Sequence, residues 1–200
     1  MLTQNIINIL KLTWPIIMIA VIIIVSIRIA WLIKYRRKFV LYQEIMGLLF
    51  LVYILLLFQI VTWQDVPLST KNLIPFKEIS RYTIGSPLFY RNVVGNLLMF
   101  IPYGFFVTYY LKLKKIWPVF ILTLIASLSI EYTQLIIGRV FDVDDVILNV
   151  VGALVGYFLY ISGKGFVKSL PRALKNTHLL NIIIVGIIAL VIFLTFGYLK

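Results

Sequence analysis

Six apolar stretches of about 20 residues, the length that one helix needs to cross roughly 30 Å of hydrocarbon, divide this chain almost from end to end. An open strand would leave unpaired peptide groups in lipid, and no alternating pattern indicates a barrel, so each stretch is predicted to be a helix. The predicted spans cover about residues 15–33, 40–62, 93–111, 116–137, 146–162 and 179–199. The predicted fold class is therefore all-α, a polytopic membrane helical bundle of about six transmembrane helices.

Composition excludes a soluble globular domain, because 62% of the residues are hydrophobic against roughly 45–50% in average globular chains. The net charge of +12 is of the kind that orients a polytopic protein, so no nucleic-acid partner is expected. The loops on one side of the predicted bundle carry eleven Lys and Arg residues and those on the other side carry seven. The more basic side is predicted to be cytoplasmic, which places both termini outside the cell.

The residue types present in the chain exclude several kinds of catalytic and metal site. There is no cysteine, which excludes disulfides, thiolate metal sites and a thiol nucleophile. His178 is the only histidine and falls in a basic loop far from the acidic residues, so a Ser-His-Asp hydrolase is not expected. A zinc site is excluded for the same reason, which leaves Ca²⁺ or Mg²⁺ as the conceivable metals and the cofactor unknown. The first apolar run is expected to be retained as a span, since a basic stretch at 34–38 follows it.

Three polar clusters interrupt the apolar pattern at the ends of predicted spans. Their members are Asn92 and Asn96; Glu131 and Gln134; and Arg139, Asp142, Asp144, Asp145 and Asn149. The third span begins, the fourth ends and the fifth begins on one side of the membrane, so the three clusters are predicted to share a leaflet. Within each helix the spacing of three or four residues keeps the polar side chains on one face. Asp144 is expected to be a solvated loop residue.

Glu131 is the most unusual member, since it lies roughly 9 Å inside its predicted helix end at 1.5 Å per residue. Ionised carboxylates at such a depth are rare and are usually paired or face a water-filled cavity. Arg139 and the Asn and Gln amides of neighbouring helices are the expected partners, and Asp145 could share a proton with Glu131. The alternative is that the polar groups only hold helices together by interhelical hydrogen bonds. Two acids on one face favour a site.

The longest predicted loop, residues 63–92, contains an apolar patch punctuated by Pro75. This segment is predicted to lie on the membrane interface or to dip into it, with Tyr82 and Tyr90 at the head-group level.

At these positions the chain resembles the VanZ-like family of membrane proteins. The resemblance rests on ordered motifs: Asn72-Leu-Ile-Pro75-Phe76; Asn92-Val-Val-Gly95-Asn96 followed by Pro102 and Gly104; Glu131-x-x-Gln134; and Arg139-x-x-Asp142-x-x-Asp145-x-x-x-Asn149-x-x-Gly152-x-x-x-Gly156. It covers about residues 45–162. It implies a multi-pass cell-membrane protein of bacteria, some members of the family lowering susceptibility to teicoplanin. It implies no catalytic assignment.

The domains are accordingly predicted as 1–44, an N-terminal span and basic loop; 45–162, the VanZ-like membrane domain; and 163–200, a basic loop and C-terminal span.

Three functions are open. The first is recognition of a lipid-linked or lipophilic envelope ligand in an outer-leaflet polar site formed by Asn92, Asn96, Gln134, Arg139, Asp142 and Asn149. The second is an intramembrane enzyme acting on an envelope lipid or its head group, with Glu131 and Asp145 as the acid-base pair and Arg139 binding an anionic group. The third, a proton-coupled transporter, needs polar residues through the midplane, where these spans show few. Membrane lipids are the expected partners, and the oligomeric state is not predicted.

Overall fold

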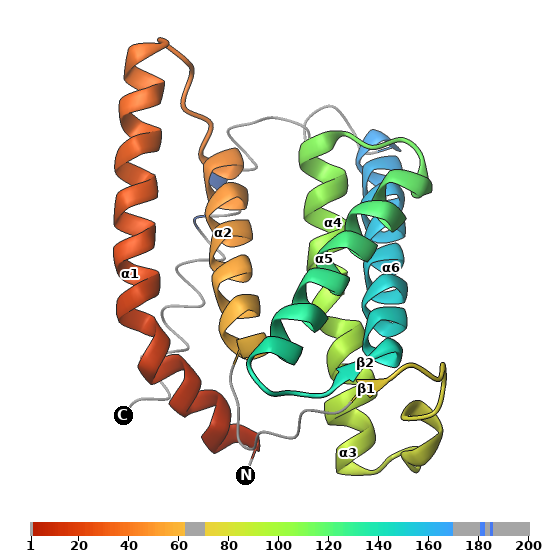
Figure 1. Ribbon diagram of the computed structural model, residues 1–200. Coiled ribbons are helices and arrows are strands. Elements are labelled where there is room, and N and C mark those ends of the chain that lie inside the picture. Colours follow the sequence, from red (N-terminus) through yellow and green to blue (C-terminus); the bar gives the residue numbers. More distant parts are fainter. Residues whose placement is uncertain (1, 63–70, 170–180, 183–184, 186–200) are drawn as a thin grey trace. The chain divides into compact units, whose positions relative to one another are not determined.

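The computed structural model describes residues 2–62, 71–169, 181–182 and 185 (Figure 1). In that part of the chain the helices are α1 (Leu2–Lys34), α2 (Leu41–Thr62), α3 (Pro87–Phe89), α4 (Gly95–Leu111), α5 (Ile116–Ile136) and α6 (Val143–Ser169). A 3₁₀ turn covers Ile79–Arg81, and a π-helical turn, Tyr90–Val94, joins α3 to α4. Two short strands, β1 (Lys71–Asn72) and β2 (Phe141–Asp142), pair in parallel.

Five helical segments among the described residues are long and apolar enough to cross a bilayer. They are Thr13–Lys34, Leu41–Val61, Pro87–Leu111, Ile116–Ile136 and Val143–Gly165. The sixth predicted span, residues 179–199, lies outside the described residues apart from 181, 182 and 185, which are helical. His178 also lies outside them. The predicted all-α membrane fold is confirmed, and the chain is a multi-pass helical membrane protein.

Two spans begin several residues earlier than predicted, because polar residues cap them. The helical path into α4 begins at Pro87 rather than at residue 93. There Ser86 accepts the N–H of Phe89 at 3.1 Å, and the proline occupies the first turn. Helix α6 begins at Val143 rather than at residue 146, since the Asp142 carboxylate accepts the N–H of Asp144 at 2.9 Å. A hydropathy pattern misses such turns because the capping residues are themselves polar.

The chain divides into two compact units, one formed by Met1–Thr13 and Tyr53–Gly163 and the other by Trp14–Val52 and Lys164–Lys200. In the second unit a bidentate ion pair joins α1 to α2. Arg28 donates to the two carboxylate oxygens of Glu44 at 2.8 and 3.1 Å and lies over the ring of Trp31. The forked geometry of guanidinium and carboxylate makes this the stronger kind of ion pair.

In the first unit, glycines let α4 and α6 approach closely. A Cβ on Gly152 would collide with the carbonyl of Leu97, and one on Gly156 with that of Ile101. Small residues of this kind permit backbone contact between membrane helices, whose association gains little from the hydrophobic effect. The buried core of the unit consists of Leu57, Val61, Phe100, Val119, Ala153 and Tyr157.

The polar residues gather at one end of this unit. The strand pair aligns Lys71 with Phe141 and Asn72 with Asp142, tying the loop before α3 to the segment between α5 and α6. Figure 1 shows β1, β2 and α3 at the end of the bundle where α5 finishes and α6 begins. The loop from 71 to 86 is therefore tied to the segment that leads from α5 into α6.

Candidate functional site

The end of α5 places the Arg139 side chain by a Schellman motif. Gly138, at φ +88°, donates its N–H to the carbonyl of Leu135 at 3.1 Å, and Arg139 donates its N–H to the carbonyl of Gln134 at 2.8 Å. A residue without a Cβ adopts this left-handed conformation at little cost. The side chains of Arg139 and Gln134 then both donate to the carbonyl of Val61, at 2.8 and 3.3 Å. That carbonyl lies in the last turn of α2, where it has no partner in its own helix.

A buried carboxylate fixes the start of β2 and α6. Glu131 is 1% exposed, and its Oε2 accepts the backbone N–H of Asp142 at 2.9 Å. Asp142 in turn uses one oxygen, Oδ1, to accept both the side-chain amide of Asn72 and the N–H of Asp144, each at 2.9 Å. Among the described residues Glu131 and Arg139 form no ion pair, so the expected partner of Glu131 is replaced by a backbone N–H.

Asp144 corrects the prediction of a solvated loop residue, because it is 1% exposed. Its carboxylate accepts three backbone N–H groups of the loop before α3, from Phe76 at 2.5 Å, Glu78 at 2.8 Å and Ile79 at 3.1 Å. Three N–H donors compensate much of the cost of burying a carboxylate. We call this interaction the Asp144 clasp, since it holds the loop against the first turn of α6.

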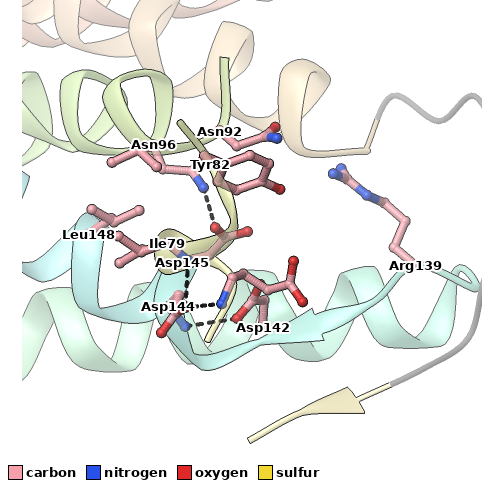
Figure 2. Close-up of a pocket in the computed structure, with 11 residues that line it drawn as sticks. Ile79, Tyr82, Asn92, Asn96, Arg139, Asp142, Asp144, Asp145 and Leu148 are labelled. Atoms are coloured by element: carbon pink, nitrogen blue, oxygen red, sulfur yellow. Dashed lines mark hydrogen bonds between the residues drawn. The ribbon is translucent and has the colours of Figure 1, made fainter. Parts of the chain in front are cut away.

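A pocket lies between the clasped loop and the ends of the helices (Figure 2). It holds about 480 Å³ of empty space, counting its open mouth, and most of its lining is polar. The lining residues are Glu78, Ile79, Tyr82, Asn92, Val93, Asn96, Arg139, Asp142, Asp144, Asp145 and Leu148. The side chain of Asn96 donates to Asp145 Oδ1, and in this view Arg139 lies across the pocket from that pair.

The structure divides the eight predicted site residues into two groups. Five of them line the pocket: Asn92, Asn96, Arg139, Asp142 and Asp145. The other three, Glu131, Gln134 and Asn149, are buried and are not part of its lining. Asn149 donates to the hydroxyl of Ser127 at 2.9 Å, while its own Oδ1 has no hydrogen-bond partner in the described part of the chain.

Three polar lining residues were missed by sequence reasoning. Glu78 and Tyr82 come from the loop before α3, and Asp144 was assigned to solvent. The Asn72-to-Phe76 motif was the available signal, because it singled out this loop. Asn92 was found by its spacing from Asn96, but its π-helical setting was not; such turns are frequent at functional sites.

Electrostatics in the pocket favour the protonated form of two groups outside the spans. Burial raises the pKa of Asp142, an effect partly offset by the hydrogen bonds from Asp144 and Asn72. Burial also raises the pKa of Tyr82, partly offset by the side chain of Asn92, so its hydroxyl is a donor at neutral pH. In the described ranges, no three His, Cys, Asp or Glu side chains are placed to hold a metal ion.

The fold and the pocket define a multi-pass helical membrane protein with a polar site at one end of its bundle. The family model described as VanZ/LLP1 matches residues 45–168. Protein VanZ from Enterococcus faecium is 34% identical over 129 residues, which cover 62% of this chain and 70% of that protein. The chain therefore belongs to the VanZ family. No solved structure matches it.

Proposed function

We propose that this VanZ-family protein binds the polar head of a lipid-linked or amphiphilic envelope ligand in the pocket and thereby contributes to teicoplanin resistance. The observation that carries the proposal is the pocket itself, which gathers polar side chains at the ends of membrane-spanning helices. Polar and ionisable groups are costly there and usually serve a site. A ligand with a polar head and an apolar tail matches this position at the edge of the bilayer.

The unused hydrogen-bonding groups of the pocket indicate the chemistry of the head. Arg139 donates to the carbonyl of Val61 through one nitrogen, Nη1, which leaves other N–H groups for a carboxylate or phosphate. Asp145 receives Asn96 on one oxygen, and the second can accept an amide or ammonium N–H. A head group that carries both an anionic group and N–H donors would use both residues.

We place the pocket in the outer leaflet. Loops on the opposite side carry eleven Lys and Arg residues and those on the pocket side carry seven, and the positive-inside rule makes the more basic side cytoplasmic. In that orientation the pocket faces the compartment in which glycopeptide antibiotics and exported lipid-linked precursors are found.

The test is antibiotic susceptibility of cells that express Asp145→Asn, with membrane abundance matched to the wild type. We expect the variant to lose any teicoplanin phenotype, because an amide replaces the carboxylate that faces the pocket. Glu131→Gln should act in the same direction but more weakly, because it replaces one carboxyl oxygen by an amide donor while the other oxygen can still accept the backbone N–H of Asp142. Ser129→Ala is the matched control, since its exposed hydroxyl bonds only within α5. Unchanged susceptibility in both acidic variants would contradict the proposal.

An enzyme acting on a lipid head group is the second candidate. The observation that favours it is that Asp145 and Arg139 line one pocket, with Glu131 bonded to the backbone of a third lining residue, Asp142. In such an enzyme Asp145 would contact the substrate as acid or base. Glu131, the other member of the predicted acid-base pair, would not touch the substrate but would position Asp142 through its backbone N–H.

Incubation of the purified protein with envelope lipid extract separates the two candidates. Mass spectrometry would follow both bound lipids and new products. Products that depend on Asp145 favour the enzyme, whereas stoichiometric binding without products favours recognition. Absence of both binding and turnover counts against the pocket as a ligand site.

A further inference from the structure

The loop that closes the pocket exposes a group of large apolar side chains. Ile84 is 84% exposed and Leu73 is 66% exposed, and Ile74 and Phe76 are nearly as open. Four strongly exposed large apolar side chains on one short loop are typical of an interaction surface rather than of an ordinary solvated loop. We call the side chains of Leu73, Ile74, Phe76 and Ile84 the apolar tip.

We propose that the apolar tip inserts into the lipid leaflet on the pocket side, so that the loop is a membrane-anchored wall of the pocket. This inference concerns the loop and holds whether or not the pocket binds an envelope ligand. It goes beyond the general expectation of an interfacial segment, because it names the side chains that would enter lipid and the groups that would hold them there.

The first support is that much of the loop backbone between residues 74 and 80 is hydrogen-bonded within the protein. The Asp144 clasp takes the N–H groups of Phe76, Glu78 and Ile79. Turn hydrogen bonds take the carbonyls of Ile74 and Phe76, from Lys77 at 3.4 Å and Ser80 at 3.1 Å. Unpaired peptide groups are the main barrier to placing irregular backbone near lipid. For residues 74 to 80 these bonds lower that barrier, so that mainly side chains would meet the bilayer.

The second support is the continuity of the loop with surfaces that face lipid. It leads directly into the spanning segment Pro87–Leu111, whose first turns expose Leu88 and Tyr90. Lys77 lies beside the apolar tip and is exposed. A cation beside apolar side chains is the arrangement of interfacial anchors, in which the side chains enter the acyl boundary and the charge meets anionic head groups. A bilayer is therefore the occupant that both the apolar and the charged groups fit.

Insertion of the apolar tip would define where a ligand enters the pocket, namely from the head-group level of the leaflet. Glu78, Ile79 and Tyr82 belong to the same loop and line the pocket. If the tip lies in the leaflet, these residues lie at the head-group level. A lipid-linked molecule would then bring its head into the pocket while its chain stays in the bilayer.

The absence of cysteine from the sequence allows a direct test with single-cysteine variants of the full chain. Ile74→Cys and Ile84→Cys would each be labelled with the environment-sensitive fluorophore NBD. The labelled proteins would be reconstituted in phosphatidylcholine vesicles that contain phosphatidylglycerol. Quenching by doxyl groups on the lipid acyl chains is then compared with quenching by aqueous iodide. Ser80→Cys is the control, as an exposed polar position on the same loop.

We expect doxyl lipid to quench the labels at 74 and 84 several-fold more than the label at 80, with iodide showing the opposite order. Adding Asp144→Asn to Ile74→Cys should weaken the lipid quenching, because an amide has one acceptor oxygen where the clasp needs two. Strong iodide quenching at both tip positions would overturn the proposal. So would protection from both quenchers that disappears when the protein is diluted in lipid, since that result assigns the tip to a second copy of the chain.

Discussion

At the scale of single residues, the four acidic side chains at the end of the bundle make different contacts and have different structural roles. Glu131 orders a backbone N–H, Asp142 caps α6, Asp144 holds the loop, and Asp145 faces the pocket with one bond to Asn96. They are close in sequence and alike in chemistry. What separates them is the set of donors that each meets.

Asp142 makes stability depend on pH in a definite direction. Because burial raises its pKa, the folded protein holds this proton more tightly than the unfolded chain does, and the penalty of the charged form is present at higher pH. Stability from this group should therefore rise as the pH falls from neutral toward about 4, the ordinary range of an unfolded Asp. Asp142→Asn should flatten that part of the profile, as measured by thermal unfolding in detergent.

The comparison of slopes tests Asp142 directly, because the two proteins differ at this residue alone. Asparagine keeps one side-chain oxygen for the bonds from Asn72 and Asp144, so the fold should be retained. An identical pH profile for the two proteins would refute the assignment.

One of these residue contacts could be predicted in outline, and the burial of Asp144 could not. The meeting of Asn96 and Asp145 follows from the number of crossings between them, because helix ends on the same side of a membrane are brought together by topology. The burial of Asp144 depends on a loop 66 residues earlier folding back to it. No local pattern around Asp144 carries that information, which is why solvation was the wrong expectation.

At the scale of elements, the close contact between α4 and α6 leaves no room for an added methyl group at its glycines. Gly152→Ala should destabilise the protein by about 1–3 kcal/mol, the typical cost of overpacking, because the added methyl meets the backbone carbonyl of Leu97 rather than a movable side chain. Gly163→Ala on the same helix is the control, as nothing lies within 4 Å of its Cβ position. Thermal unfolding in detergent measures the difference. Equal stability of the two variants would contradict the close packing.

The existence of the long helices could be predicted because lipid permits few alternatives for apolar stretches. The residues at which two of these helices begin could not be predicted. Ser86 and Asp142 cap the first turns of α3 and α6 by hydrogen bonds, and a hydropathy pattern does not record such bonds. The short pairing of β1 with β2 also left no signal, as two-residue strands have no periodicity. It is nonetheless the element that aligns the loop with the pocket.

At the scale of the whole molecule, orientation decides which compartment the pocket serves. With the pocket side outside, Ser80→Cys in intact cells should react with a membrane-impermeant maleimide. Lys114→Cys, in the exposed turn between α4 and α5, should react only after the cells are opened. The reverse labelling order would place the pocket in the cytoplasm and remove the extracellular part of the proposed function. Since wild-type chain contains no cysteine, it supplies the background control.

The parallel pairing of Asn72 with Asp142 joins residues 70 positions apart, and this spacing has a consequence for biogenesis. The ribosome releases Asn72 long before Asp142 exists, with two spans to be threaded into the bilayer between them. A nascent chain thus acquires its first spans early and its pocket late, when the beginning of α6 emerges. A chain truncated between these two events would integrate into the membrane yet lack the pocket.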